Sequence, residues 1–136
     1  MRLYLLDTNT VSYILNGRST AARKHLHTLP STDAACISAI TEAELNYGIA
    51  KLGNDRRRLA LHALLLKMPV QPWDSDAASI YGPLRAKLEK AGRMLAPLDT
   101  QIAAHAIALG ATLVTREKAF QQVGDLSGIV NWATDL

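Results

Sequence analysis

Four acidic residues that are far apart in the sequence stand at positions suited to metal-dependent chemistry. Asp7 and Glu117 each follow a short apolar run that predicts a strand. Glu44 and Asp99 each lie near the start of a segment with helical spacing. Gathered carboxylates repel one another unless a cation shares the site, and oxygen ligands favour Mg²⁺ or Mn²⁺ over zinc. Because such ions activate water for in-line displacement at phosphorus, the four acids indicate a metal-dependent nuclease.

Each of these acids also has a structural interpretation. Asp7 would cap a helix that starts after it, a task that several polar neighbours could share. Glu44 stands three residues after Thr41, the spacing of a capping box, and Asp99 would interact favourably with the positive end of a helix dipole. Taken alone, Glu117 is a solvated first-turn acid. The nuclease interpretation therefore depends on a fold that brings all four side chains together.

The elements that would position these residues alternate between strand and helix. Apolar runs predict strands at residues 2–6, 35–37, 70–72, 112–114 and 129–132. Helical segments are predicted at 10–16, 20–29, 41–52, 55–67, 74–92 and 97–110, with a kink or break at Gly82-Pro83. This alternation predicts one α/β domain over residues 1–136 with a mainly parallel sheet. Ligands collect at the switch point of such sheets, where the first and fourth strands can end side by side.

The composition fits a basic protein with an aliphatic core. Hydrophobic residues make up 49% of the 136 residues, aromatic residues only 5%, and the formal net charge is +3. Without the four acids the rest of the chain carries +7, a balance suited to holding a phosphate backbone. The single Cys36 excludes an internal disulfide framework, and its apolar context predicts a buried, reduced thiol. Since we find neither a membrane-spanning run nor room for a signal peptide, we expect a cytoplasmic protein.

Other residues of chemical interest have simpler interpretations. The four histidines do not form a metal-ligand pattern, and His105 lies roughly 240° around its helix from Asp99. The arginine run at 56–58 is typical of a solvated helix face, with RNA contact and subunit packing as alternatives. Arg93 is the cation that we expect nearest the carboxylates. Asn9 argues against a phosphotransferase that needs a second aspartate there, and the single acid after the first strand argues against a phosphoreceiver domain.

Four segments, in order along the chain, carry a resemblance to a known family. They read LLDTN at 5–9, IS and ELNYG within 37–48, DxxIAAxA at 99–106, and LVTxExxF at 113–120. With these segments the chain resembles the PIN-domain nucleases, and in particular the VapC-type toxins of bacterial toxin–antitoxin pairs. Each segment alone is weakly diagnostic, but the ordered set is specific and runs from the first strand to the tail at Trp132.

The resemblance implies a PIN-like three-layer α/β/α sandwich and Mg²⁺- or Mn²⁺-dependent endoribonuclease activity. The metal ligands of the family would correspond to Asp7, Glu44 and Asp99, whereas Glu42 does not fall on a motif position. The fourth acidic position corresponds to Glu117, where the family more often has aspartate. The longer side chain would hold a second ion differently, or only through water. In this interpretation all four acids are catalytic and bind metal.

Supporting residues and partners follow from the same resemblance. Thr8, Asn9 and Thr115 would orient ligands or water at the metal. Attack by water would leave 3′-hydroxyl and 5′-phosphate ends on an RNA, for which a transfer RNA is the expected substrate. The family also implies a homodimer and a cognate antitoxin. That antitoxin would wrap the toxin, insert a cationic side chain into the acidic pocket, and supply the DNA binding of the complex.

Two other functions are alternatives to the RNA nuclease. A non-catalytic binding module would keep the acidic pocket only to grip a partner protein's arginine, an alternative suggested by Glu117 in place of aspartate. Mn²⁺ affinity distinguishes this module from a nuclease, because a gripping pocket need not bind the ion. A DNA nuclease of similar fold lacks support, since a chain this short has no additional DNA-clamping region.

Overall fold

The computed structural model describes residues 1–136 and has a five-stranded sheet at its centre. All neighbouring strands are parallel, in the order β3-β2-β1-β4-β5. The strands are β1 (Leu3–Leu6), β2 (Ala34–Ser38), β3 (Val70–Gln71), β4 (Thr112–Val114) and β5 (Ile129–Val130). Because β1 pairs with β2 on one side and with β4 on the other, the switch point lies between β1 and β4. The first and fourth strands therefore end side by side, as predicted.

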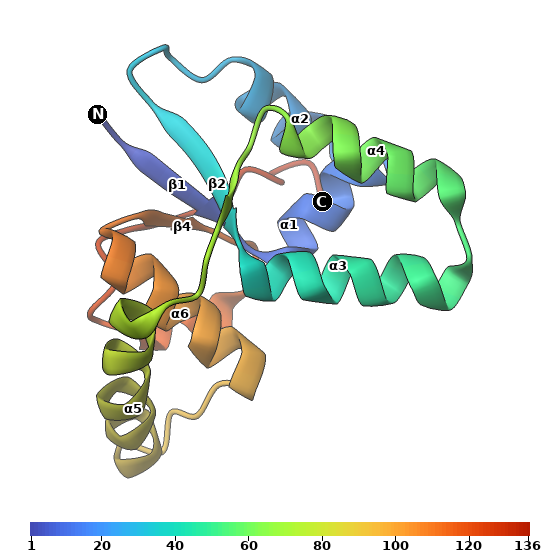
Figure 1. Ribbon diagram of the computed structural model, residues 1–136. Helices are drawn as coiled ribbons and strands as arrows, with labels where there is room; N and C mark the ends of the chain where they lie inside the picture. Colours follow the sequence, from blue (N-terminus) through green and yellow to red (C-terminus); the bar gives the residue numbers. More distant parts are fainter.

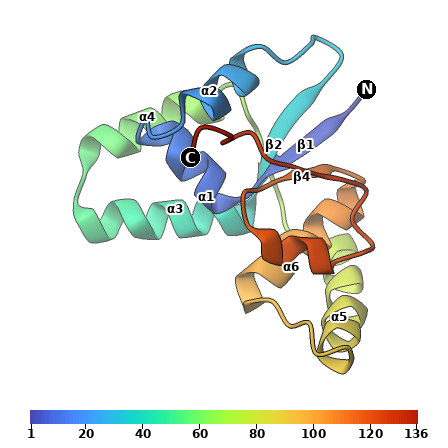
Figure 2. The same ribbon diagram turned by 180° about the vertical axis from the view of Figure 1, so that it is seen from behind.

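Six α-helices cover the two faces of the sheet and complete the predicted three-layer α/β/α sandwich (Figures 1 and 2). They are α1 (Thr8–Leu15), α2 (Thr20–His27), α3 (Ala39–Leu52), α4 (Asp55–Leu65), α5 (Ser75–Lys90) and α6 (Pro97–Leu109). A 3₁₀ helix, η1 (Lys118–Gln122), follows β4. Helices α1 to α4 pack on one face, and α5 and α6 pack on the other. None of the helices combines the length and apolarity that a membrane crossing requires.

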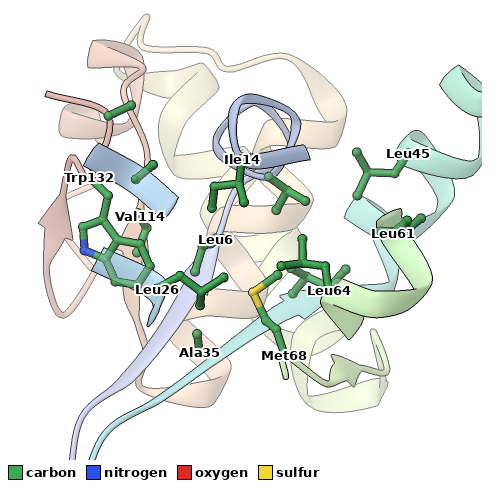
Figure 3. Close-up of a cluster of buried hydrophobic side chains, with 14 of the residues drawn as sticks. Leu6, Ile14, Leu26, Ala35, Leu45, Leu61, Leu64, Met68, Val114 and Trp132 are labelled. Atoms are coloured by element: carbon green, nitrogen blue, oxygen red, sulfur yellow. The ribbon is translucent and has the colours of Figure 1, made fainter. Parts of the chain in front are cut away.

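Two apolar clusters, one on each face of the sheet, form the core. Side chains alternate along β1, so that Leu6 belongs to the cluster under α1 to α4 and Leu5 to the cluster under α5 and α6. Figure 3 shows the first cluster, in which Leu6 and Val114 of the sheet lie among helix side chains that include Ile14 and Leu64. Burial of one such side chain contributes about 1.5–3 kcal/mol. This mostly aliphatic core holds the strand ends in a fixed arrangement.

The single cysteine, Cys36, lies in the second cluster as a free, buried thiol. Burial raises its pKa to about 11, because the charged thiolate is poorly solvated there. The prediction of a buried thiol is therefore confirmed.

Several local predictions differ from the structure. α1 begins at Thr8, two residues before the predicted start, because Asp7 caps it. α5 continues through Pro83 without a break, and both Pro83 and Ser79, whose carbonyl lacks its helical donor, are exposed residues. The helix predicted at 55–67 ends as α4 at Leu65, and Leu59 within it and Leu66 directly after it are 71% and 89% exposed. Other leucines of that helix face the core instead.

Candidate active site

A polar cavity of about 310 Å³ lies at the switch point, beyond the ends of β1 and β4. No apolar side chain lines it, and its residues are Asp7, Thr8, Asn9, Glu44, Asp99 and Glu117. The end of β1 and the start of α1 supply three of them, whereas α3, α6 and the connection from β4 to η1 supply one acid each. The structure thus brings together the four acids that the sequence singles out, from four separate parts of the chain.

Asp7 is the most buried of the four acids, with 4% of its surface exposed. Its Oδ1 accepts a hydrogen bond from the Thr10 backbone N–H at 2.9 Å, so Asp7 does cap α1. Its Oδ2 accepts a hydrogen bond from the Thr115 hydroxyl. Burial raises the pKa of Asp7, and the negative Glu117 adds to the rise, while the bonds from Thr115 and Thr10 oppose it. The carboxylate is therefore fixed in orientation, but its charge is incompletely compensated.

Thr115 connects the two strand ends that meet at the switch point. Its hydroxyl donates to Asp7 after β1 and accepts from the Glu117 backbone N–H at 2.9 Å. A backbone bond strengthens the same junction, because the Asp7 N–H donates to the Val114 carbonyl at 3.0 Å. Thr115 is itself buried. One buried hydroxyl thus ties the orientation of Asp7 to the path of the chain that carries Glu117.

Glu44 projects from α3 and does not take part in capping the helix. Ser38 caps α3 with its hydroxyl, so the structural alternative for Glu44, a capping box with Thr41, is not formed. Glu44 Oε1 instead accepts a hydrogen bond from the Thr8 hydroxyl at 2.7 Å, and Thr41 Oγ1 lies 3.2 Å from the same hydroxyl oxygen. Because α3 starts two residues earlier than predicted, Glu44 is past the capping turn and lines the cavity. Glu42 lies outside the lining.

Asp99 and Glu117 form the more open side of the cavity. Asp99 is half-buried in the first turn of α6, and burial raises its pKa together with the negative charges of the other three acids. Glu117 is exposed and precedes η1, and its Oε1 accepts a hydrogen bond from the Asn9 amide at 3.1 Å. Thr8, Asn9 and Thr115 thus each hold a different acid. Among the four acids, only Asp99 receives no bond from a side chain.

The acids have no cationic side chain within ion-pair distance. The three ion pairs of the protein are Arg58–Asp55, Arg85–Glu89 and Lys87–Asp125. Arg93, which we predicted near the carboxylates, is exposed and does not line the cavity. It follows Gly92, whose left-handed φ of 66° turns the chain at the end of α5. The donors suit a hard cation, although no three carboxylates are drawn together into a ligand set in this structure.

His105 has a structural role that the sequence did not reveal. It is 1% exposed, and its Nδ1 lies 2.8 Å from the hydroxyl of Ser38, the residue that caps α3. Burial lowers the pKa of His105, against the opposing effects of Asp74 and the Pro72 carbonyl. A neutral ring thus links α6, which carries Asp99, to the start of α3. As predicted, His105 does not line the acidic cavity.

Comparisons with known proteins match the chain to one family over most of its length. The sequence profile of the PIN domain matches residues 4–126. Ribonuclease VapC2 of Rickettsia felis is 33% identical over 132 residues, which cover 96% of this chain and 98% of that protein. The tRNA(fMet)-specific endonuclease VapC of Shigella flexneri is 32% identical over 128 residues, covering 93% of this chain and 96% of that protein. The matched region includes all four acids.

Solved structures show the same fold. A chain in the crystal structure of VapBC2 from Rickettsia felis, bound to a promoter DNA fragment, superposes with a TM-score of 0.89 at 32% identity. The match covers 96% of this chain and 98% of that one. A chain in DNA-bound VapBC from Salmonella typhimurium gives a TM-score of 0.87 at 30% identity, covering 97% and 99% of the two chains. The similarity therefore includes every element that supplies the acidic cavity.

Proposed function

The chain belongs to the PIN domain family, and on this premise we propose that it is a metal-dependent endoribonuclease, the toxin of a toxin–antitoxin pair. The observation that carries the proposal is the polar cavity that four carboxylates share at the switch point of the sheet. Relatives named ribonuclease and tRNA(fMet)-specific endonuclease support RNA as the class of substrate. The basic remainder of the chain suits a polyanion.

The donor set of the cavity fits Mg²⁺ or Mn²⁺. Carboxylate, hydroxyl and amide groups line it, with neither histidine nor cysteine among them, which disfavours zinc. Burial raises the pKa of Asp7 and of Asp99, and a dication would favour their charged forms. We assign Asp7, Glu44 and Asp99 as the residues that would hold the catalytic ion. Glu117 would complete the site or position the attacking water.

The protein's own side chains prepare the site for hydrolysis. When bound, the ion would polarise the phosphate and lower the pKa of the attacking water. Thr115 fixes the direction of Asp7, and Thr8 fixes that of Glu44, so two carboxylates are oriented before substrate arrives. Glu117 stands at the exposed side, where water can reach it. Attack by water leaves 3′-hydroxyl and 5′-phosphate ends, whereas a 2′,3′-cyclic phosphate would show attack by the RNA's own hydroxyl.

The finer assignments draw on the relatives. A transfer RNA or another structured RNA is the proposed substrate, since one relative is named for tRNA(fMet). The VapBC complexes among the solved structures, including DNA-bound ones, support a cognate antitoxin as partner. In this proposal the antitoxin supplies the DNA binding. The toxin forms a homodimer and acts on RNA in the cytoplasm.

Cleavage of total cellular RNA by the purified protein in Mn²⁺ tests the proposal. We expect discrete fragments, and none after a chelator removes the metal. Asp7→Asn should lower the rate by about 10³-fold or more, because several kcal/mol of transition-state stabilisation are lost and about 1.4 kcal/mol corresponds to tenfold. Asparagine still caps α1, so a melting temperature no lower than that of the unaltered protein would separate loss of chemistry from loss of fold.

Glu44→Gln and Glu42→Gln form a matched pair on α3. Both glutamates are half-buried, but only Glu44 lines the cavity. Cleavage that is lost in Glu44→Gln and kept in Glu42→Gln would support the assignment. Equal cleavage by these variants and by Asp7→Asn would identify a contaminating nuclease or another site. If the unaltered protein neither cleaves RNA nor binds Mn²⁺, the non-catalytic module that grips a partner's arginine becomes the better interpretation.

A further inference from the structure

A second, smaller cavity adjoins the acidic one and contains an arginine. Its volume is about 90 Å³, and it shares Thr8 and Glu44 with the acidic cavity. Ser12, Gly48 and Arg57 line only the second cavity, together with apolar side chains of α1 and α3. The two shared residues form a common wall. A ligand that crosses this wall would contact the carboxylates on one side and the guanidinium on the other.

Arg57 has no partner within the protein. It is half-buried and makes no side-chain hydrogen bond or ion pair, whereas the next residue, Arg58, pairs with Asp55 at 2.9 Å. Its backbone N–H is held at 3.2 Å by Asn54, which caps α4. The start of a helix carries partial positive charge and favours anions, so a cation in this turn does not stabilise α4. The guanidinium is therefore available to a ligand in the cavity.

Gly48 leaves space in the second cavity. It lies inside α3, where glycine is less favourable than alanine. Its φ is not positive, and no atom lies within 4 Å of the place where a Cβ would stand. Neither the backbone conformation nor packing therefore requires glycine at this position. Ser12, on the same cavity, has a hydroxyl that forms no hydrogen bond within the protein and is free to donate to a ligand.

We propose that Arg57 binds a backbone phosphate of RNA next to the phosphate that is cut in the acidic cavity. This inference rests on the proposed nuclease function. The phosphates of RNA are negatively charged and are repelled by the four carboxylates. A cation just outside the acidic cavity would offset this repulsion and hold the adjoining phosphate. The planar guanidinium matches a phosphate with two parallel hydrogen bonds. The Ser12 hydroxyl supplies a further donor on the same cavity.

The test measures RNA binding without cleavage, in protein that carries Asp7→Asn. The affinity for a fluorescently labelled RNA hairpin is measured over a series of KCl concentrations. Arg57→Ala should reduce the slope of log affinity against log salt by about 0.7 to 0.9, the contribution of one phosphate contact. Arg57→Lys should keep the slope, because the charge remains. Arg58→Ala is the matched control and should leave the slope unchanged, because Arg58 lies outside both cavities.

Three results would overturn the proposal. The first is an equal slope for Arg57→Ala and Arg58→Ala. The second is unchanged RNA binding with altered Mn²⁺ binding, which would make Arg57 an internal counter-ion for Glu44. The third is unchanged RNA binding with weaker binding of an acidic peptide, which would assign the cavity to a protein partner.

Cleavage by the otherwise unaltered protein separates this proposal from the nuclease function. If the protein cleaves RNA in Mn²⁺ and Arg57→Ala does not change the salt dependence of RNA affinity, only the proposed contact between Arg57 and a phosphate is wrong. If the protein neither cleaves nor binds RNA, the nuclease function and the phosphate contact are both wrong.

Discussion

The two sides of the acidic cavity differ in how firmly they hold their carboxylates. On one side Asp7 and Thr115 are buried, and both oxygens of the Asp7 carboxylate accept hydrogen bonds. On the other side Glu117 is exposed and Asp99 is half-buried without a side-chain donor. The buried side orients one carboxylate before any ligand arrives, whereas the open side leaves room for a phosphate chain to enter. Changes on the buried side should therefore have larger effects than changes on the open side.

The buried side also shows that capping alone does not explain Asp7. Asparagine caps helices about as well as aspartate and would not bury a charge. The raised pKa of Asp7 shows that its negative charge is disfavoured in the folded protein. The capping bond thus accounts for the side-chain oxygen but not for the charge. The proposed cation accounts for the negative charge, because it would offset the cost of burying a carboxylate at this position.

Thr115→Val should give the largest effect among changes that leave the acids intact. Valine has a similar shape but lacks the hydroxyl that donates to Asp7 and accepts from the Glu117 N–H. Loss of a group that orients a metal ligand typically lowers metal affinity by about 10- to 100-fold. We expect a loss of this size in Mn²⁺ affinity, measured by calorimetry. Thr115→Ser keeps the hydroxyl and should bind nearly as well as the unaltered protein, and tight binding by Thr115→Val would contradict the preorganised buried side.

The raised pKa of Asp7 predicts that acid stabilises the metal-free protein through this residue. Above the ordinary pKa of 3.8, a carboxyl with a raised folded pKa binds more protons in the folded than in the unfolded state. Its contribution to the free energy of unfolding therefore rises as the pH falls from neutral through the folded pKa. His105 acts in the opposite direction below about 6.5, because burial lowers its pKa.

The comparison with Asp7→Asn removes the contribution of His105, which is common to both proteins, and keeps the effect of the Asp7 charge, including its part in raising the pKa of Asp99. The free energy of unfolding is measured by urea denaturation in a chelator at several pH values. As the pH falls, the free energy of unfolding of the unaltered protein should rise relative to that of Asp7→Asn. A difference that does not change with pH would show that the charge of Asp7 is already compensated in the folded protein.

The sequence was sufficient to predict the α/β sandwich and to select the four acids, but not the details of the helix ends. Apolar runs identify strands because buried strands need them, and acids that follow strands gather at one edge of a parallel sheet. Serine and threonine are both favoured as helix caps, so residue type alone cannot show whether Ser38 or Thr41 caps α3. Pro83 permits a continuous helix only because it faces solvent, and exposure depends on the tertiary fold.

The roles of His105 and Arg57 depend on contacts between elements that are distant in the sequence. His105 lies 67 residues from Ser38, and Arg57 meets the cavity because α4 folds back along α3. A signal for His105 was present, since a large polar ring in a helix of small, buried residues needs a partner. The arginine run offered no such signal, because its three members differ only in what surrounds them.

Glu117→Gln should have a smaller effect on metal affinity than Thr115→Val. Interactions of exposed charges contribute about 1 kcal/mol or less, so we expect a loss of less than about tenfold in Mn²⁺ affinity. If Glu117 positions the attacking water, the cleavage rate at saturating Mn²⁺ should fall more than the affinity does. Calorimetry and cleavage assays on the same preparation separate the two. A loss of affinity as large as that of Thr115→Val would instead make Glu117 a direct ligand.

Gly48→Ala should have the smallest effect, and it tests whether the second cavity is kept accessible at the expense of stability. Alanine inside a helix is more favourable than glycine by about 0.5–1 kcal/mol, and no atom within 4 Å obstructs the added Cβ. The free energy of unfolding in urea should rise by this amount. RNA cleavage at low substrate concentration should fall, because the methyl group narrows the cavity that contains Arg57. A variant that is more stable and equally active would show that substrate does not enter this cavity, and would leave the open side at Asp99 and Glu117 as the path for the phosphate chain.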